Sequence, residues 1–500
     1  MLLRNYKYSL IPIFIILSLF ALKGRAIFSY SLDNDGLEFY FINTIQRMQL
    51  GVNIYADPLS LPYGNCLYTP IYFYFLNSVY QILHIDVFND LHLAFIIGRM
   101  FSFVCVLIQV IYLYKFIRKI HLNNTVVIIS ISCYLMLITG HMYALRPDAL
   151  KDLFFILFLF YAFEYVHFSK RYFYLVLAAI FGILSLFTKQ DIIFHLSIFS
   201  FVTLLIYRNK RILLLLSVLA MGIICVFSFI FWYHGKYIID NWFLLNAQTI
   251  DDIFLVVLMY IIIPTLVKTA PFIILTLCNL LGIRQHRLTD KFQQTIVIMG
   301  VMMYVVSHLV LMRAGANLNY TYEMSFVLIL NVNIFYVNQR DFIQRFETRF
   351  LLSILFFLIF LFGINILFKY YKYEWWKEKS YKTVLYQNLK ERSDIKKYLN
   401  GQYVYFPNTE LTAFYPEHTT ILGHDMHLDR FIQIYTGMNY KSRLSYINTA
   451  TYDSNFRNGI IQFIVISNVA PFKKHVEHYY PSYSLDTIIQ TKAIYRYTQK

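Results

Sequence analysis

Charged residues are scarce in this sequence. They make up 14% of the 500 residues, whereas a soluble domain carries about 25%. Cysteine is scarce as well: of the five, only Cys66 lies outside an apolar segment, so the chain has no disulfide framework. Acidic residues number 28 against 44 Lys and Arg. The basic residues form short clusters between apolar runs, which excludes nucleic acid as the partner.

Apolar residues are abundant instead, at 58% of the chain with a mean hydropathy of +0.52. They recur in runs from Ile11 to Phe368, as expected for a protein whose solvent is a lipid bilayer. The first run, Leu10 to Leu22, resembles the core of a signal peptide, but Lys23-Gly24-Arg25 follows in place of a small-residue cleavage site. We expect a retained first span. The runs predict roughly eleven spans: 8–24, 95–115, 124–142, 149–168, 172–188, 191–207, 212–233, 258–281, 293–312, 320–338 and 350–369.

Basic clusters follow every second predicted span. They begin with Arg4 and Lys7 before the first span and end with Arg340, Arg345 and Arg349 after the tenth. The positive-inside rule therefore predicts a cytoplasmic N-terminus and an outward C-terminus. The aromatic stretch 69–84 would reverse this pattern if it were counted as a span, so we interpret it as an interfacial or re-entrant helix.

Two long regions then face outward. One is the first loop, about 25–94, and the other is the tail from 371 to 500. The tail contains strand-like stretches at Gln402–Phe406, Ile461–Ser467 and Ala493–Tyr497, which predict a small α/β domain. We therefore expect a transmembrane module over 1–370 and an extracytoplasmic domain over 371–500.

Polar residues gather at the outward ends of the predicted spans. Any one of them alone is better explained by a helix cap or by a side chain that snorkels to the headgroups. Together they indicate a function, because charges near membrane depth are costly. They are Asp33, Asp35, Glu38, Arg99, Arg146, Asp148, Lys189, Asp191, Arg313, Asn317, Asn319 and Glu323.

Two of these stretches have a chemistry of their own. Asp35 and Glu38 are three residues apart before an amphipathic stretch, Leu37 to Leu50, so one carboxylate could act as a general base, although a capped interfacial helix explains the spacing equally well. Arg146-Pro147-Asp148 opens a span, and a helix N-terminus beside an arginine is a phosphate site.

The order of these motifs resembles that of GT-C glycosyltransferases, such as the protein mannosyltransferase family (glycosyltransferase family 39) and the bacterial lipid A aminoarabinose transferases. The resemblance covers about residues 1–370. Its motifs are Asp35…Glu38, Gly51-x-x-x-Tyr55-x-Asp57-Pro58, Tyr68-Thr69-Pro70-Ile71-Tyr72, Arg99, Arg146-x-Asp148, Thr188-Lys189-Gln190 and Gly315-Ala-Asn317-Leu-Asn319-Tyr320-x-x-Glu323.

This resemblance implies an all-α polytopic membrane protein of GT-C type with a small α/β extracytoplasmic domain. It implies transfer of a sugar from a polyprenyl-phosphate donor to a glycan, lipid or protein outside, by direct displacement with inversion. Asp35 would be the base, supported by Glu38 or Asp33. The residues implied for substrate and phosphate binding are Arg99, Arg146, Asp148, Lys189, Arg313, Asn319 and Glu323.

The sequence departs from the family in its acids, which are spread over 33–38 whereas many relatives place Asp and Glu side by side. No cofactor is required by these motifs, and a divalent metal stays open. His424-Asp425-Met426-His427 is the nearest approach to zinc spacing, and we interpret it as a surface cluster.

Three other functions stay open. A transporter or flippase for lipid-linked sugars is favoured by Lys268 between Pro264 and Pro271. An O-antigen ligase or polymerase would also face outward, and a scaffold would use the tail for binding. The richness in Ile, Tyr, Lys and Asn is typical of AT-rich bacterial genomes, so we expect the inner membrane of a bacterium.

Overall fold

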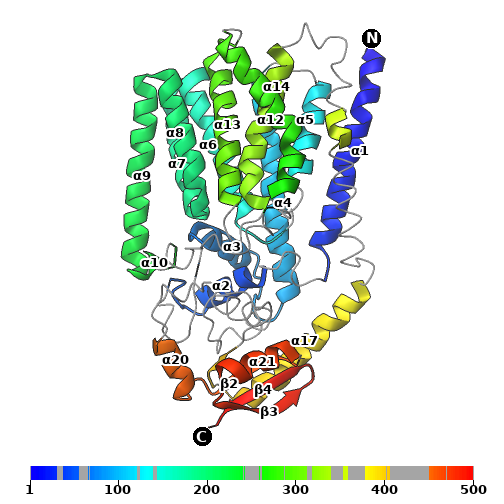
Figure 1. Ribbon diagram of the computed structural model, residues 1–500, viewed down its shortest axis with the longest axis vertical. Helices are drawn as coiled ribbons and strands as arrows, with labels where there is room; N and C mark the ends of the chain where they lie inside the picture. Colours follow the sequence, from blue (N-terminus) through cyan, green and yellow to red (C-terminus); the bar gives the residue numbers. More distant parts are fainter. Residues whose placement is uncertain are drawn as a thin grey trace. The chain divides into compact units, whose positions relative to one another are not determined.

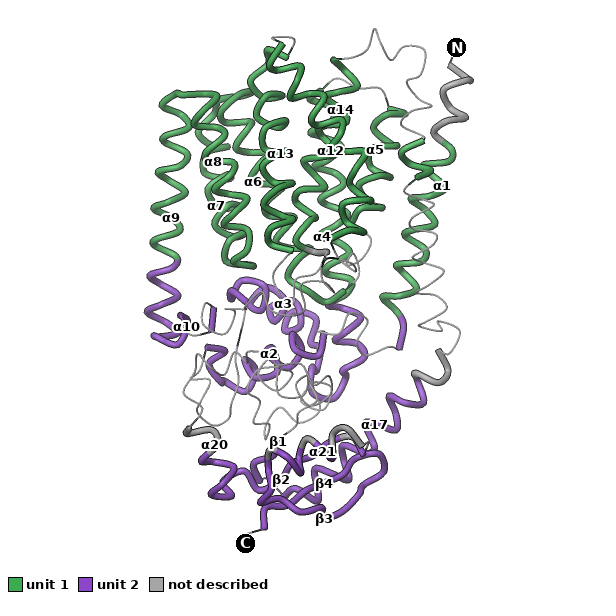
Figure 2. Tube along the Cα trace, viewed as in Figure 1, with its two compact units in different colours: residues 1–28, 99–226, 253–375 green, residues 29–98, 227–252, 376–500 purple. Residues whose placement is uncertain are grey.

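A computed structural model gives the fold and describes most of the chain. The described residues are 2–30, 38–55, 66, 68–120, 124–138, 144–239, 241–242, 258, 262–285, 288–311, 318–338, 353–357, 378–400, 402–405, 450–468 and 470–498. They form two compact units (Figure 2). Unit 1 comprises 1–28, 99–226 and 253–375, and unit 2 comprises 29–98, 227–252 and 376–500.

Unit 1 is a bundle of long apolar helices (Figure 1). Six helices are long and apolar enough to cross a membrane, counting described residues only. They are α1 (Leu2–Ile27), α4 (Leu91–Lys119, which begins in unit 2), η2 with α8 (Gln190–Ile192 and Ile193–Tyr207), α9 (Lys210–His234, whose end is in unit 2), α12 (Ile263–Arg284) and α13 (Lys291–Leu311). The others are α5 (Asn124–Leu137), α6 (Asp148–Phe163), the π-helical turn η1 (Glu164–Phe168), α7 (Tyr172–Thr188), η5 (Leu318–Thr321) and α14 (Tyr322–Asn338).

Small and amide side chains join α12, α13 and α14. A Cβ on Gly300 of α13 would clash with the side-chain amide of Asn331 on α14, so glycine allows the close approach. Asn331 donates to the Ile296 carbonyl at 3.1 Å, and Asn279 donates to the Asn331 carbonyl at 2.8 Å. Small residues and interhelical hydrogen bonds hold helices together where lipid provides no hydrophobic driving force.

The predicted spans coincide with helices from the first to the tenth. The eleventh, 350–369, lies largely outside the described residues, so the number eleven stays a prediction. The stretch 69–84 forms α3 (Ile71–Ile82), whose 12 residues are too few to cross a bilayer.

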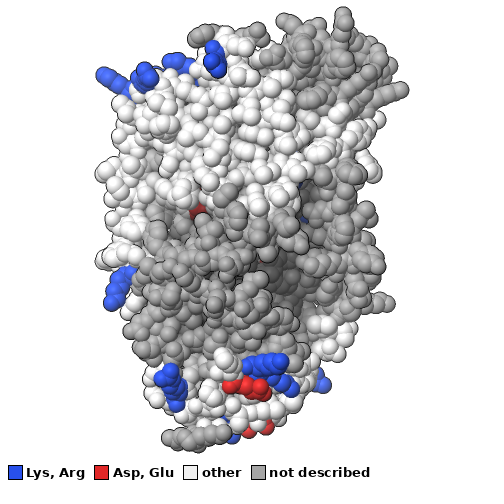
Figure 3. Space-filling view, viewed as in Figure 1, with Lys and Arg blue, Asp and Glu red and all other residues white. Residues whose placement is uncertain are grey.

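Basic side chains mark one end of the unit 1 bundle (Figure 3). Lys119, at the end of α4, pairs with Glu164 of η1 at 2.7 Å. Lys170 and Arg171 precede α7, and Arg208 lies between α8 and α9. The opposite end of the bundle, where α6 and α14 begin, carries both acidic and basic side chains, and these are buried.

In unit 2, the first loop contains α2 (Glu38–Gln49) and α3. The predicted amphipathic helix is present, but it is buried on more than one side: Phe41, Ile42 and Ile45 are fully buried and so are Glu38 and Gln46. Gln46 donates to the Val87 carbonyl at 2.8 Å, and Tyr80 of α3 donates to the Ala94 carbonyl at 2.7 Å. Rings surround Phe41, among them those of Tyr68, Tyr72 and Phe73.

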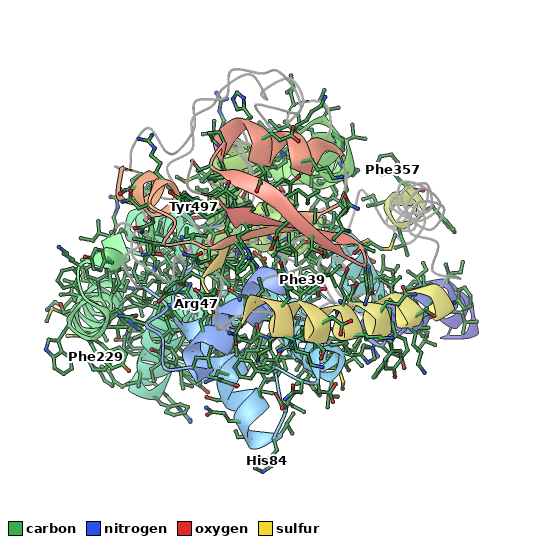
Figure 4. The ribbon with its side chains drawn as sticks, turned by 90° about the horizontal axis from the view of Figure 1, so that it is seen from below. Phe39, Arg47, His84, Phe229, Phe357 and Tyr497 are labelled. Carbon is green, nitrogen blue, oxygen red and sulfur yellow. The ribbon has the colours of Figure 1, made fainter. Side chains whose placement is uncertain are left out.

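The rest of unit 2 contains the short helix α10 (Tyr237–Ile239) and the α/β domain of the tail. Its helices are α17 (Glu378–Leu399), α20 (Ala450–Arg457) and α21 (Ala470–Tyr479), and its strands are β1 (Val404–Tyr405), β2 (Phe463–Ser467), β3 (Tyr483–Ile489) and β4 (Lys492–Tyr497). The sheet order is β1-β2-β4-β3, with β1 parallel to β2 and the other pairs antiparallel. Figure 4 shows this sheet from below, with Tyr497 on β4 and the α2 residues Phe39 and Arg47.

All three predicted strand regions contain a strand. β3 was not predicted, because its pattern is irregular: Leu485 and Ile488 are exposed while Tyr483 is buried, and the register shifts between Leu485 and Thr487. Within unit 2 the tail also contacts the first loop, since Arg392 of α17 donates to the Phe88 carbonyl at 2.7 Å. The compact units therefore group the loop with the tail, and the predicted boundary at 370/371 stays a prediction.

Candidate functional site

The N-terminal end of α6 begins a set of buried charges in unit 1. Pro147 is the N-cap residue and its carbonyl accepts from Lys151 at 2.9 Å, as suits proline at a helix start. Asp148 follows in the first turn. Nε of Arg146 lies 3.2 Å from Oδ2 of Asp148, and both side chains are buried.

Lys189 reaches this helix end from the turn between α7 and η2. Its backbone is extended, which separates the two helices and points the side chain inward. Nζ donates to Oδ1 of Asp148 at 2.7 Å and lies 3.4 Å from Oδ2 of Asp191 and 4.3 Å from the Tyr320 ring centre. Lys189 therefore does not snorkel toward headgroups; it is a buried partner of two carboxylates.

Lys151 occupies the centre of the set. Its side chain is fully buried, and its Nζ has four carboxylates within 4.0 Å. The distances are 2.5 Å to Glu323 of α14, 3.3 Å to Asp191, 3.5 Å to Asp152 and 4.0 Å to Asp148. Ser185 of α7 donates to the Lys151 carbonyl at 3.0 Å. Three stretches far apart in the sequence thus meet at one ammonium group.

We call these seven residues the buried ionic cluster: Arg146, Asp148, Lys151, Asp152, Lys189, Asp191 and Glu323. Three basic and four acidic side chains give it a formal charge of −1. Burial of such groups is tolerated only where they are paired, and in membrane helices ionisable groups mark function by default. An anion bound here must therefore share a cation with a carboxylate.

Sequence reasoning missed Lys151 and Asp152, because both fall inside the predicted span 149–168 and its apolar run hid them. A signal was present. Asp148, Lys151 and Asp152 have the spacing i, i+3, i+4, which puts them on one face of a helix. Such a charged face in an otherwise apolar helix is rare.

The structure places the other predicted site residues as follows. Arg99 lies in α4 and is fully buried in unit 1, while Glu38 opens α2 and is fully buried in unit 2. Asn319 lies in η5, without a described side chain. Asp33, Asp35 and Arg313 lie outside the described residues. The structure thus brings together Arg146, Asp148, Lys189 and Glu323 of the predicted set, and the roles predicted for all of them stay predictions.

Two further features concern the transporter alternative, for which Lys268 was cited, and the open question of a divalent metal. Lys268 of α12 donates to the Leu137 carbonyl at the end of α5 at 2.7 Å, so it caps a helix end. Among the described residues, no three His, Cys, Asp or Glu side chains are grouped as metal ligands.

No protein-family model matches the sequence, and no curated protein matches it. Solved structures do match. ArnT from Cupriavidus metallidurans in the apo state has a TM-score of 0.57 at 11% identity, over 96% of this chain and 97% of that chain. The same enzyme bound to undecaprenyl phosphate has a TM-score of 0.57 at 10% identity, over 97% of both chains. An Archaeoglobus fulgidus oligosaccharyltransferase tethered to an acceptor peptide has a TM-score of 0.49 at 12% identity, over 90% of this chain and 69% of that one.

At such low identity the likeness to ArnT concerns the fold. It extends over almost the full length of both chains, so it includes the membrane bundle, the first loop and the tail. The resemblance to GT-C glycosyltransferases is confirmed at this level: the chain is a multi-pass membrane protein with a GT-C-type fold.

Proposed function

We propose that this protein is a glycosyltransferase that moves a sugar from a polyprenyl-phosphate donor to an acceptor outside the cytoplasmic membrane. The observation that carries the proposal is the full-length likeness of fold to ArnT, one of whose structures is bound to undecaprenyl phosphate. The buried ionic cluster supports it, because a lipid-linked phosphate needs cations at the depth where membrane helices begin.

Arg146 and Lys189 are the cluster residues that we propose for the donor phosphate. A guanidinium has five N–H donors, so Arg146 can hold Asp148 and a phosphate oxygen at once. Asp148 fixes both cations, at 3.2 Å and 2.7 Å, and so prepares their positions before the donor binds. Lys151 is enclosed by carboxylates and serves as the fixed cation that holds them. Arg99 and Arg313 are proposed as further phosphate partners, and Asn319 and Glu323 as further substrate-binding residues.

The proposed reaction is a single displacement. Asp35 takes the proton from an acceptor hydroxyl, and the acceptor oxygen forms a bond to the anomeric carbon of the sugar. The bond from that carbon to the phosphate oxygen breaks, and polyprenyl phosphate leaves with the electron pair, which inverts the anomeric centre. Glu38, fully buried at the start of α2, or Asp33 would support the base, since a nearby carboxylate makes proton uptake by Asp35 more favourable.

The test is sugar transfer from a panel of radiolabelled polyprenyl-phosphate sugars in purified membranes. We expect the wild type to transfer one of them and the Asp35→Asn variant, at equal expression, to lose transfer. Transfer that survives in Asp35→Asn moves the base to Glu38 or Asp33. If the wild type uses no donor but carries lipid-linked sugar across vesicle membranes, the transporter function replaces this proposal.

We also propose the bacterial inner membrane as the location, with the N-terminus inside and the first loop outside. Labelling of single cysteines with a membrane-impermeant reagent tests this arrangement. A cysteine introduced at Asn65 should react from outside intact cells. Reaction only after permeabilisation would contradict both the topology and the proposed side of the reaction.

A further inference from the structure

A small pocket is lined by residues of unit 2 only. Its volume is about 270 Å³. We call it the loop pocket, and its lining residues come from the end of α2, the segment after it, α3 and the end of α9: Met48, Gly51, Val52, Asn53, Ile54, Tyr74, Tyr233 and His234.

Hydrogen bonds fix the polar side of the loop pocket. Oδ1 of Asn53 accepts from the Tyr55 amide at 3.0 Å, so the same oxygen must accept from Nδ1 of His234 at 2.8 Å. With its proton on Nδ1, the neutral imidazole accepts at Nε2 from the Tyr74 hydroxyl at 3.1 Å. Nδ2 of Asn53 donates to the His234 carbonyl at 3.3 Å. The pocket wall is therefore preorganised before any ligand arrives.

The chemistry of the wall is neutral and aromatic. No lining residue carries a fixed charge, so an anionic phosphate would find no counter-charge here. Two tyrosine rings are accessible: Tyr74 is 39% exposed and Tyr233 is 64% exposed. An aromatic face is electron-rich and attracts weakly positive C–H groups, while amides and hydroxyls bind other hydroxyls. A ring-shaped ligand with C–H groups on its face and hydroxyl groups at its edge could stack on the tyrosine rings and hydrogen-bond to the amides and hydroxyls of the wall.

Size and position narrow the ligand further. Pockets for drug-sized ligands begin at about 300 Å³, and 270 Å³ lies just below, which suits one sugar ring. The end of α9 beside the pocket exposes Trp232 and Phe229, the latter directed outward (Figure 4). Exposed aromatic residues at the end of a membrane helix are typical of the lipid–water interface.

We propose that the loop pocket binds an uncharged sugar residue of the acceptor, so that the acceptor is a glycan, either free or linked to a lipid. The identification of this sugar as part of the acceptor rests on the glycosyltransferase function proposed above; the binding of the sugar does not.

Direct binding tests the proposal. The full chain is placed in lipid nanodiscs free of sugar detergents, because maltoside detergents would compete for the pocket. Methyl glycosides of neutral hexoses and N-acetylhexosamines are then titrated and followed by saturation-transfer NMR. In a second arm the nanodiscs contain a monohexosyl diacylglycerol, counted by native mass spectrometry. Binding in the first arm identifies a free glycan, and binding only in the second identifies a lipid-linked one.

Variants localise the binding. Tyr233→Ala and Tyr74→Ala should each weaken it about three- to tenfold, as expected for the loss of one aromatic face. Tyr74→Phe keeps the ring and removes only the bond to His234, so it should bind within about twofold of the wild type. Tyr386→Ala, an exposed tyrosine of α17 outside the pocket, is the matched control and should bind normally. Thermal unfolding shows that each variant is folded.

The outcomes are separable. Absence of glycoside and glycolipid binding by the wild type, or equal binding by Tyr233→Ala and the wild type, overturns the loop pocket as a sugar site. A short peptide that binds and is lost in Tyr233→Ala overturns it as well. If the sugar binds as expected but no donor sugar is ever transferred, the pocket stands and the glycosyltransferase function fails. If transfer occurs and Tyr233→Ala leaves the KM for acceptor unchanged, the assignment to the acceptor fails alone.

Discussion

The buried ionic cluster of unit 1 and the loop pocket of unit 2, both proposed here as binding sites, differ in the kind of side chain that forms them. The cluster consists of seven ionisable residues that pair with one another at 2.5–4.0 Å. The pocket has no fixed charge and leaves two tyrosine rings accessible. A cluster of this kind can hold a charged group in place, but a substitution that changes its net charge is expected to destabilise the protein. A neutral pocket selects its ligand by shape and by hydrogen bonds to hydroxyls, and small substitutions there are expected to cost less stability. The difference predicts how each region responds to mutation.

The largest effect should come from the centre of the cluster. Lys151→Met leaves four carboxylates without their shared cation and should destabilise the protein by about 3–5 kcal/mol. Thermal unfolding in nanodiscs measures this loss. Adding Glu323→Gln restores the formal charge of −1, so the double variant should recover part of the lost stability. An unchanged melting temperature in Lys151→Met would show that the cluster does not depend on its central cation.

A second effect should separate binding from stability within the cluster. Arg146→Ala should raise the KM for the polyprenyl-phosphate donor about tenfold or more while the protein stays folded, because hydrogen bonds to charged groups contribute about 1.5–3 kcal/mol. Steady-state transfer kinetics measure it. Lys210→Ala, an exposed basic residue at the other end of the bundle, is the control and should behave as wild type. Equal donor kinetics for both variants would remove Arg146 from the phosphate site.

The pocket should respond to lost hydrogen bonds more than to an added charge. Asn53→Leu removes the acceptor of Tyr55 and His234 and should lower stability by about 1–3 kcal/mol. Asn53→Asp keeps that acceptor oxygen and loses only the donor to the His234 carbonyl, so its loss should be smaller. Thermal unfolding compares the two. Equal losses, or a larger loss in Asn53→Asp, would show that charge matters here as it does in the cluster.

The smallest effect concerns the loop beside the pocket and requires no substitution. Burial raises the pKa of the Cys66 thiol to about 12, so it is protonated near neutral pH. Maleimide should therefore label Cys66 slowly at pH 7. The rate should keep rising with pH beyond 9, where exposed thiols are already ionised. Mass spectrometry of peptides from native and unfolded protein measures the site. Fast labelling of the native protein at pH 7 would mean that this part of unit 2 opens.

Much of the fold could be predicted because each helix that crosses a bilayer requires a long run of apolar residues, which is visible in the sequence. Runs of apolar residues predicted the helices, and the pattern of basic clusters kept 69–84 out of the set of spans, where the structure has the 12-residue helix α3. Three strands were predicted from their β-branched and aromatic residues, while the edge strand β3 was missed. The register of β3 shifts between Leu485 and Thr487, and this irregularity interrupts the alternation by which a strand is predicted.

The site was harder to predict, for two physical reasons. Lys151 lies within an apolar run of the sequence. Only its contacts with Glu323 of α14 and with Asp191 show that it occupies the centre of an ionic cluster. The loop pocket depends on a contact between Asn53 and His234, which are 181 residues apart in the sequence. A local sequence pattern cannot predict such a contact. Local spacing in the sequence can therefore suggest the role of a residue, but it cannot show which distant residues the fold brings into contact with it.

The ionic pairs of unit 1 also constrain how the chain is made. A membrane protein is inserted as it is synthesised, N-terminal parts first. When α6 enters the membrane, it carries Asp148, Lys151 and Asp152 without Glu323, which is still about 170 residues from synthesis. Arg146, just before α6, provides the first opposite charge, and Lys189 and Asp191 arrive with the next hairpin. We therefore expect α6 and α7 to insert together, and the pairing of Lys151 with Glu323 to form only after α14 has been made.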